Sequence, residues 1–318
     1  MSDRLETQKL RVHAVRLEAD SIISVELRDV QQRDLPPFTA GAHVDLRLPN
    51  GLVRSYSLCG DPRRADRYTV AINRDPASRG GSAWLHENLR VGQVIPVTPP
   101  RNNFALNEDA AHSVFIAGGV GITPLLAMIR RLTVLGKPWT LWFATRTQSQ
   151  MAFAEELQEL AGDLGTVHLH YDEESRTFLD LEAIVKQAPA GSHFYCCGPM
   201  PMLKAFEAID MPRELRHIEY FQNDAAPDTE GGFEVELTES GKTVQVPEGK
   251  SILDALMDAG VDVPFSCTEG ICGTCETRVI SGIPDHRDLV LTDAEKESNE
   301  VMMICVSGSK SDRLVLER

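Results

Sequence analysis

The sequence predicts a multidomain protein in which an antiparallel β-barrel, an α/β domain with a parallel sheet and an α+β domain follow one another. Three observations predict this class. Short alternating strands fill the first third, strands alternate with helices in the middle, and a loop of closely spaced cysteines lies near the end. A chain of 318 residues, 42% of them hydrophobic, has room for three such cores. We expect domains at residues 1–108, 109–224 and 233–318, with a linker at 225–232.

The first domain is predicted from short alternating apolar and polar runs. The expected strands are residues 11–15, 22–27, 43–48 and 68–72. Turn-rich breaks such as Leu35-Pro36-Pro37 and Pro49-Asn50-Gly51 separate them. Several short strands with such turns favour a small antiparallel barrel.

The second domain is predicted from strands that alternate with amphipathic helices. The expected strands are 113–117, 140–144, 167–171 and 193–197, with helices at 124–135 and 152–161. This alternation indicates βαβ units on a parallel sheet. A polar stretch at 223–232, with proline and glycine, reads as a linker. Two strands (233–238 and 243–246) and a helix (251–259) then predict the α+β domain that carries the cysteine loop.

Four cysteines near the C-terminus carry the most specific chemical signal: Cys267, Cys272, Cys275 and Cys305. The C-x4-C-x2-C run with a distant fourth cysteine is the spacing of a plant-type [2Fe–2S] cluster. Gly270 and Gly273 permit the tight loop that points three thiolates at one pair of irons. A zinc knot or a disulfide pair is the alternative, but zinc sites usually pair their ligands as two short units, which this spacing does not match. A cluster of this type carries one electron at a time.

Composition narrows the choice of partners and compartment. The net charge of −15 argues against nucleic acid, which needs basic patches. We expect no signal peptide, and the longest apolar stretch, residues 114–129, is broken by glycines and a proline, so we expect no membrane span and a cytoplasmic protein. Residues 231–318 hold 8 Lys/Arg and 17 Asp/Glu, a balance of 8 − 17 = −9. Solubility and steering toward a basic partner both explain this charge, and the choice stays open.

Two segments of the first domain are candidate ligand contacts. Residues 54–58, Arg-Ser-Tyr-Ser-Leu, offer a cation, two hydroxyls and an aromatic ring, which suit a ligand with an anionic end and a flat ring. On its own, the segment is better explained as an ordinary exposed strand. Gly80 and Gly81 precede Ser82, which we expect to be a helix N-cap. The same glycine pair would expose N–H groups at the positive helix end, where phosphate binds.

Two turns of the second domain are candidate dinucleotide contacts. Residues 118–124, Gly-Gly-Val-Gly-Ile-Thr-Pro, join the first strand to the first helix, and the glycines allow a dinucleotide to approach the backbone. Cys197, Gly198 and Pro199 end a later strand of the same sheet. Ligands bind at the carboxyl ends of strands in open α/β sheets, so both turns should face one crevice. A buried core thiol is the alternative role of Cys197.

Taken together, these residues resemble the phthalate dioxygenase reductase-like family, single-chain flavin and iron–sulfur reductases that serve Rieske-type oxygenases. The resemblance covers nearly the whole chain. Besides the segments above, it rests on Glu219-Tyr220-Phe221, on the run Asp285-His286-Arg287-Asp288-Leu289-Val290-Leu291-Thr292 and on Cys305-Val306-Ser307. One departure is Gly308, since many relatives carry arginine after the serine, and this puts partner docking in doubt.

The resemblance implies FMN in the barrel, NADH on the α/β domain and a β-grasp, ferredoxin-like domain last. It implies FMN contacts at Arg54, Ser55, Tyr56, Ser57, Ala71, Ile72, Asn73, Gly80, Gly81 and Ser82, with Phe221 covering the flavin. It implies NADH contacts at Gly119, Gly121, Thr123, Cys197, Gly198 and Pro199, with Arg146 and Asp172 at the adenosine end. Cys197, near the nicotinamide, and Thr123, which approaches the flavin, are the implied catalytic residues.

The implied function is electron transfer from NADH through FMN to the cluster, and on to a separate Rieske-type aromatic-ring dioxygenase or O-demethylase in aromatic catabolism. We expect a monomer. NADH is favoured over NADPH by the resemblance and because no basic cluster follows the second strand, at residues 146–149. The alternatives are a reductase for a cytochrome P450 or another monooxygenase, and an electron carrier or redox sensor without turnover.

Overall fold

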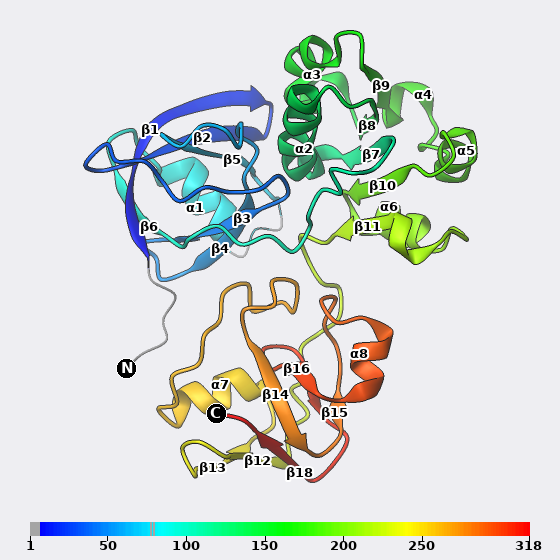
Figure 1. Ribbon diagram of the computed structural model, residues 1–318. Coiled ribbons are helices and arrows are strands. Elements are labelled where there is room, and N and C mark those ends of the chain that lie inside the picture. Colours follow the sequence, from blue (N-terminus) through cyan, green and yellow to red (C-terminus); the bar gives the residue numbers. More distant parts are fainter. Residues whose placement is uncertain (1–6, 77, 79) are drawn as a thin grey trace. The chain divides into compact units, whose positions relative to one another are not determined.

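The computed structural model describes residues 7–76, 78 and 80–318 (Figure 1). Residues 1–6, which include part of the stretch where we expected no signal peptide, lie outside the described residues, as do Ala77 and Arg79. The described chain divides into two compact units, Thr7–Tyr220 and Phe221–Arg318. Each is described by itself below.

The first unit begins with a six-stranded antiparallel barrel, as predicted. Its strands are β1 (Gln8–Ala19), β2 (Ile22–Asp29), β3 (His43–Arg47), β4 (Val53–Ser57), β5 (Tyr68–Asn73) and β6 (Val94–Val97), in the order β4-β3-β6-β1-β2-β5. A bridge between Leu58 and Val70 and a 2.9 Å bond from Cys59 N to Thr69 O join the two end strands and close the barrel. Successive side chains along each strand point to opposite faces of the sheet. One face therefore supplies a core that includes Leu10, Val25 and Ile72.

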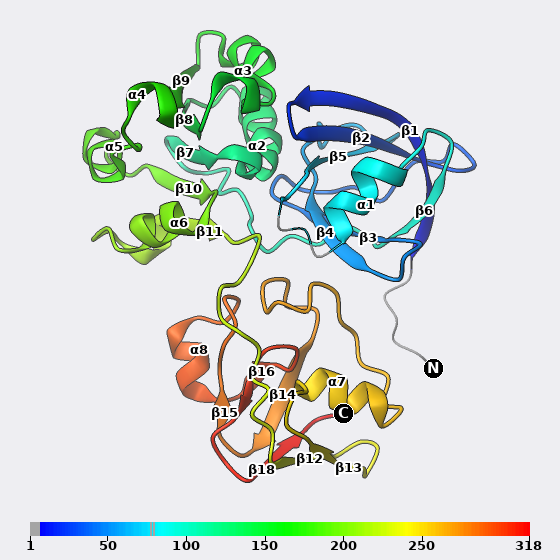
Figure 2. The same cartoon turned by 180° about the vertical axis from the view of Figure 1, so that it is seen from behind.

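Helix α1 (Gly81–Asn88) packs beside the barrel, next to β4 (Figure 2). The prediction that Ser82 caps this helix is wrong. Gly80 is the N-cap, in the left-handed conformation with φ 86°, and Ser82 lies inside the first turn. The Ser82 hydroxyl bonds instead to Ser78 Oγ, at 3.0 Å. Gly80 takes the cap position because it adopts positive φ without the strain that a side chain would bring.

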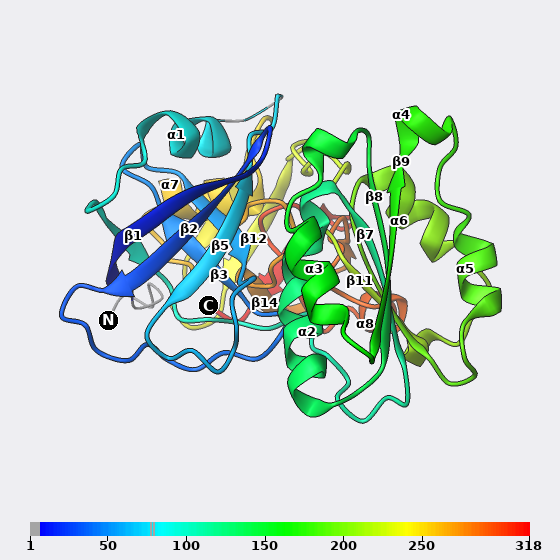
Figure 3. The same cartoon turned by 90° about the horizontal axis from the view of Figure 1, so that it is seen from above.

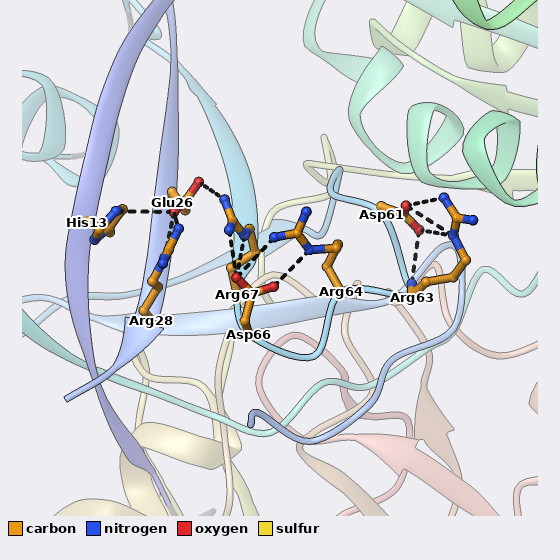
Figure 4. A network of polar contacts seen from close by, with 8 residues as sticks. All are labelled: His13, Glu26, Arg28, Asp61, Arg63, Arg64, Asp66 and Arg67. Atoms are coloured by element: carbon orange, nitrogen blue, oxygen red, sulfur yellow. Dashed lines mark hydrogen bonds and ion pairs between the residues drawn. The ribbon is translucent and has the colours of Figure 1, made fainter. Parts of the chain in front are cut away.

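A network of arginines and carboxylates crosses the outside of the barrel (Figure 4). Its centre is Glu26 on β2, which is 4% exposed. Arg28 Nη2 and Arg67 Nη1 each lie 2.7 Å from its carboxylate oxygens. Burial alone would raise the pKa of Glu26, but the hydrogen bond from Arg28 and the charges of Arg67 and Arg28 outweigh it and lower that pKa. The carboxylate therefore stays ionised although the strand buries it.

The unit continues with a five-stranded parallel sheet, as predicted. The strands are β7 (Ser113–Gly118), β8 (Trp139–Thr145), β9 (Gly165–Tyr171), β10 (His193–Cys197) and β11 (Arg216–Glu219), in the order β11-β10-β7-β8-β9. The helices are η1 (Gly119–Gly121), α2 (Ile122–Leu135), η2 (Gln148–Gln150), α3 (Ala154–Ala161), α4 (Asp172–Ser175), α5 (Leu181–Gln187), α6 (Met200–Glu207) and η3 (Arg213–Leu215). α2 and α3 cover one face of the sheet and α5 and α6 the other (Figure 3). This is a doubly covered sheet, whose strands are apolar on both faces.

The second unit is a compact α+β domain, as predicted. Its elements are β12 (Phe233–Leu237), β13 (Thr243–Val246), α7 (Ile252–Asp258), β14 (Glu276–Ser281), β15 (Pro284–Asp285), α8 (Asp293–Ser298), β16 (Val301–Met303), β17 (Gly308–Ser309) and β18 (Arg313–Leu316). The main sheet has the order β13-β12-β18-β14-β16, with β12 and β18 parallel. Ser251 caps α7 in a reciprocal capping box with Asp254, an arrangement that contributes about 1 kcal/mol to a helix.

The predicted linker at 225–232 lacks helix and strand, but part of it is anchored to this second unit. Asp228 is 7% exposed, and its N–H donates to Val306 O at 2.8 Å. Within the described part of the chain, no helix combines the length and the apolar character needed to cross a membrane.

Candidate functional site

The four predicted metal ligands converge at one end of the second unit. Cys275 Sγ lies 3.1 Å from Cys305 Sγ. Hydrogen bonds from Cys272 and Cys305 lower the pKa of the Cys267 thiol, and the contacts with Cys267 raise the pKa values of Cys272 and Cys305. As metal ligands all four would be ionised thiolates, and at this spacing they would repel one another unless positive charge lay between them. The set therefore fits an iron–sulfur cluster held by four thiolates.

The loop that carries three of these cysteines depends on its two glycines, as expected. Gly270 and Gly273 have φ values of 66° and 74°. A Cβ added at Gly270 would also lie 2.5 Å from Val306 Cγ2. The close packing turns backbone amides toward sulfur, and Glu269 N lies 3.4 Å from Cys267 Sγ. Amide-to-sulfur bonds of this kind stabilise a negatively charged cluster.

Gly308, at which the family resemblance implies an arginine, is in contact with the anchored linker. A Cβ at this position would lie 1.4 Å from Asp228 Oδ2, so the carboxylate of Asp228 occupies the place of a side chain. Arg287 Nη2 approaches Asp228 Oδ1 to 3.6 Å. The lack of a side chain at Gly308 thus leaves room for the buried carboxylate of Asp228.

The barrel places a cation against the beginning of a helix. A Cβ at Gly81 would lie 2.6 Å from Arg54 Nε, so a larger residue here would displace the Arg54 side chain from the first turn of α1. The helix N-terminus and the guanidinium are both positive, and side by side they favour an anion between them. This arrangement fits a phosphate group.

The other predicted flavin contacts lie on β4 and β5. The Ser55 hydroxyl donates to Asp45 Oδ1 at 2.7 Å, and Asn73 Oδ1 accepts a bond from Ser21 Oγ at 2.7 Å. Burial raises the pKa of Tyr56, so its phenol stays protonated. Ala71 and Ile72 are buried in β5. The flavin roles of these residues stay predictions.

The two predicted nicotinamide turns meet closely, as the sheet order requires. β7 and β10 are neighbours, with Ala117 opposite Cys197. A Cβ at Gly121 would lie 2.1 Å from Cys197 O, and one at Gly118 would lie 2.4 Å from Pro199 Cδ. Glycine at these positions therefore lets one turn pack directly on the other.

The remaining predicted residues of this region hold less specific positions. Thr123 is buried, and its hydroxyl donates to Val120 O at 2.9 Å within its own turn. Gly119 has φ 53°, with open space where a Cβ would be. Phe221 is the exposed first residue of the second unit, and its proposed cover of the flavin stays a prediction.

Glu219 is a candidate functional residue that the sequence-based site omitted. It lies at the end of β11, opposite Cys197 of β10, and its Oε2 accepts a bond from Ser57 Oγ of the barrel at 3.4 Å. Burial raises the pKa of Glu219 to about 8, although the bond from Ser57 opposes this shift. Burial and the charge of Glu219 also raise the pKa of Cys197. A signal was present in Glu219-Tyr220-Phe221, which begins at the last residue of the last strand of the sheet.

Arg146 and Asp172, which we predict at the adenosine end of NADH, lie near each other at the edge of the sheet away from Glu219. They follow β8 and β9, and Glu173 N donates to Arg146 O at 3.0 Å. Burial raises the pKa of Asp172, while His170 and Arg146 oppose this shift. The carboxyl ends of the five strands thus carry Glu219 at one side and this pair at the other, with the two glycine turns between them.

The raised pKa of Glu219 gives a pH-dependent stability. Above its usual pKa of 4.5 the unfolded chain releases this proton while the folded chain keeps it until about pH 8, so stability falls as pH rises across this window. We expect Glu219→Gln to match wild type near pH 5 and to melt at a higher temperature at pH 8, by about 2–4 °C for each kcal/mol recovered. Thermal denaturation of flavin-loaded protein measures this. Glu214→Gln, at an exposed position, is the control, and a constant difference at all pH values would contradict the assignment.

The geometry fits an oxidoreductase with a nicotinamide site and an iron–sulfur site, and comparison with known proteins identifies this class. Residues 235–309 match the 2Fe-2S iron-sulfur cluster binding domain, and residues 115–208 match the oxidoreductase NAD-binding domain. The phenoxybenzoate dioxygenase subunit beta of Ectopseudomonas oleovorans is 53% identical, over 97% of this chain and 96% of the relative.

Two solved structures extend the comparison over the whole fold. Phthalate dioxygenase reductase, described as a modular structure for electron transfer from pyridine nucleotides to [2Fe–2S], is 37% identical with a TM-score of 0.74, over 98% of both chains. An intact type IV self-sufficient cytochrome P450 monooxygenase is also 37% identical, with a TM-score of 0.87. That match covers 98% of this chain and 41% of the longer protein. The chain belongs to the phthalate dioxygenase reductase-like family.

Membership confirms the predicted fold class, with its barrel, parallel-sheet and ferredoxin-like parts. The protein is an NADH-dependent flavin iron–sulfur oxidoreductase, the reductase component of an oxygenase system. FMN, NADH and the [2Fe–2S] cluster are its cofactors, and an oxygenase component is its class of partner.

Proposed function

We propose that this chain takes electrons from NADH at the crevice of Cys197 and Glu219 and delivers them through its cluster to a Rieske-type oxygenase that attacks an aromatic substrate. One observation carries the first half of this route. Ser57 of the barrel and Glu219 of the α/β sheet lie within 3.4 Å of each other, so the predicted flavin and nicotinamide sites adjoin. Bound FMN supplies the step between a two-electron donor and a one-electron cluster.

The residues around this junction hold and orient the two ligands. The backbone of the two interlocked turns and the pair Arg146 and Asp172 would bind the dinucleotide along the strand ends. Arg54 and the start of α1 would hold the FMN phosphate. The Cys197 thiol stays neutral, so the nicotinamide would meet no negative sulfur. Hydride transfer mainly requires that the nicotinamide and flavin rings be held in contact.

The test is anaerobic addition of NADH to protein loaded with flavin and cluster. We expect NADH alone to produce the rhombic EPR signal of the reduced cluster, and NADPH to produce it more slowly. A signal that develops only with dithionite would overturn the proposed route. Turnover would then be measured with purified Rieske oxygenase components as acceptors, by product formation per NADH consumed.

A cytochrome P450 as the acceptor is the second candidate. It is favoured by the match to part of a self-sufficient P450 monooxygenase. The same assay separates the candidates, since the true acceptor couples NADH consumption to product formation and a false one does not.

Location and assembly state are part of the proposal. The buried thiols Cys59, Cys196 and Cys197 support a reducing compartment, the cytoplasm. We propose that the protein acts as a monomer, which sedimentation equilibrium tests.

A further inference from the structure

The segment that leads into the second unit is exposed at most of its positions. Of residues 221–230, only Asn223 and Asp228 are partly or fully buried. A polar segment that serves only as a spacer would leave all its side chains in water. The two exceptions therefore point to specific contacts.

Asn223 uses its whole amide group within the second unit. Its Nδ2 donates to Glu269 O at 3.1 Å and to Arg287 O at 2.8 Å. Its Oδ1 accepts a bond from Ala225 N at 2.9 Å, which assigns the orientation of the amide. Both N–H groups and the carbonyl oxygen have partners, a match that an aspartate of the same shape would not reproduce because it cannot donate.

Glu269 connects this contact to the cluster loop. Its carbonyl accepts from Asn223, and its own N–H donates to Cys267 Sγ at 3.4 Å. The next carbonyl, that of Gly270, accepts from Leu289 N at 2.9 Å. Two consecutive peptide groups between Cys267 and Cys272 are thus held from outside the loop.

The motif at residues 285–292 supplies the other half of this support. Arg287 gives the second carbonyl for Asn223, and its own N–H donates to Ser307 Oγ at 3.3 Å, two residues after Cys305. Asp288 is buried, and its Oδ2 accepts from Leu291 N at 2.8 Å, which fixes the turn that presents Leu289. The motif therefore contacts both chain segments that carry cluster ligands.

We propose that Asn223 is a positioning residue that sets the reduction potential of the cluster, by holding the Glu269 amide against the sulfur of Cys267. This inference rests on the proposed function, in which the loop carries the redox cluster. Hydrogen bonds to cluster sulfurs stabilise the more negative, reduced form and raise the potential. Without the Asn223 side chain, Glu269 loses an anchor and its N–H···S bond weakens, so the cluster becomes harder to reduce.

Asn223→Ser and Asn223→Ala test this in the full chain. Serine can still accept the bond from Ala225 N, but it is too short to reach Glu269 O, and neither variant adds a charge. Gln245→Ala is the matched control, because it removes an amide that bonds Glu234 on the strand pair β12 and β13 of the same unit. Each protein is titrated anaerobically and followed by EPR and visible absorbance, and cluster content is measured as iron and sulfide per chain.

We expect both Asn223 variants to keep the cluster but to hold about tenfold less of it reduced at a given potential, a shift of 59 mV to more negative values for one electron. The control should titrate like wild type. Equal midpoints in all four proteins would overturn the inference, and so would loss of the cluster from both variants with the control loaded, which would assign Asn223 to cluster retention. A wild-type protein without an EPR signal after dithionite would instead remove the proposed function itself.

Discussion

Cys275→Ser should abolish reduction of cytochrome c by NADH while it spares reduction of ferricyanide. Cys275 is 3% exposed and its sulfur lies 3.1 Å from that of Cys305, so it is buried against another predicted ligand. Loss of one of four thiolate ligands removes the one-electron exit, and we expect cytochrome c reduction below about 1% of the wild-type rate. Ferricyanide can draw electrons from the flavin directly. Steady-state rates with the two acceptors measure the split.

The matched control for this experiment is Cys59→Ser. Cys59 is equally buried, but it lies in the barrel, and its thiol donates to Thr69 O at 3.4 Å, a bond that a serine hydroxyl preserves. This variant should keep both activities and the EPR signal. If Cys275→Ser lost both activities in parallel, electrons would not pass from flavin to cluster in the proposed order.

Gly121→Ala should remove most NADH-dependent activity with every acceptor. Its Cβ would lie 2.1 Å from Cys197 O and 2.8 Å from Gly198 N, and these backbone atoms cannot move aside without opening the junction of the two turns. Overpacking of this kind costs about 1–3 kcal/mol of stability. A displacement of about 1 Å at a site that works by alignment costs about 100-fold in rate. We expect a loss of that size in kcat/KM for NADH, measured with ferricyanide.

Flavin content and dithionite reduction of the cluster should be unchanged in Gly121→Ala, because the atoms nearest the added Cβ belong to Cys197 and Gly198 and not to the barrel or the second unit. Gly136→Asn is the control. Gly136 ends α2 with φ 66°, has open space around its Cβ position, and asparagine tolerates this conformation. Activity in Gly121→Ala within twofold of this control would show that the interlocked turns do not place the nicotinamide.

The parts that the sequence predicted well are those with a strong local signal. The cysteine loop has a spacing that few other sites share, and the glycines between its cysteines do have positive φ. The alternation of β7, α2 and β8 was readable because apolar strands and amphipathic helices differ in period. Gly121 is a predicted dinucleotide contact and Gly118 belongs to the same predicted turn, but their packing against Cys197 and Pro199 depends on strand order.

The parts that were missed depend on contacts between distant positions. The candidate role of Glu219 depends on its hydrogen bond with Ser57, 162 positions earlier in the chain. It also depends on the register of β10 and β11, which places Glu219 opposite Cys197. Ser82 is a local exception: it has the chemistry of an N-cap, but Gly80, two residues earlier, holds the cap position with φ 86°. Asn223 was assigned to a linker because its neighbours are polar, and only its bonds to residues 269 and 287 separate it from a spacer.

Gly308 and Asp228 have a practical consequence for protein engineering. Because the acid fills the volume that any larger residue at 308 would take, the two positions form a single module and should be exchanged together. In a chimera with arginine at 308 and the aspartate kept in place, the arginine would displace the chain beside Cys305. A change in acceptor preference would then reflect this displacement and not a contact made by the arginine. Swapping both at once gives the interpretable comparison.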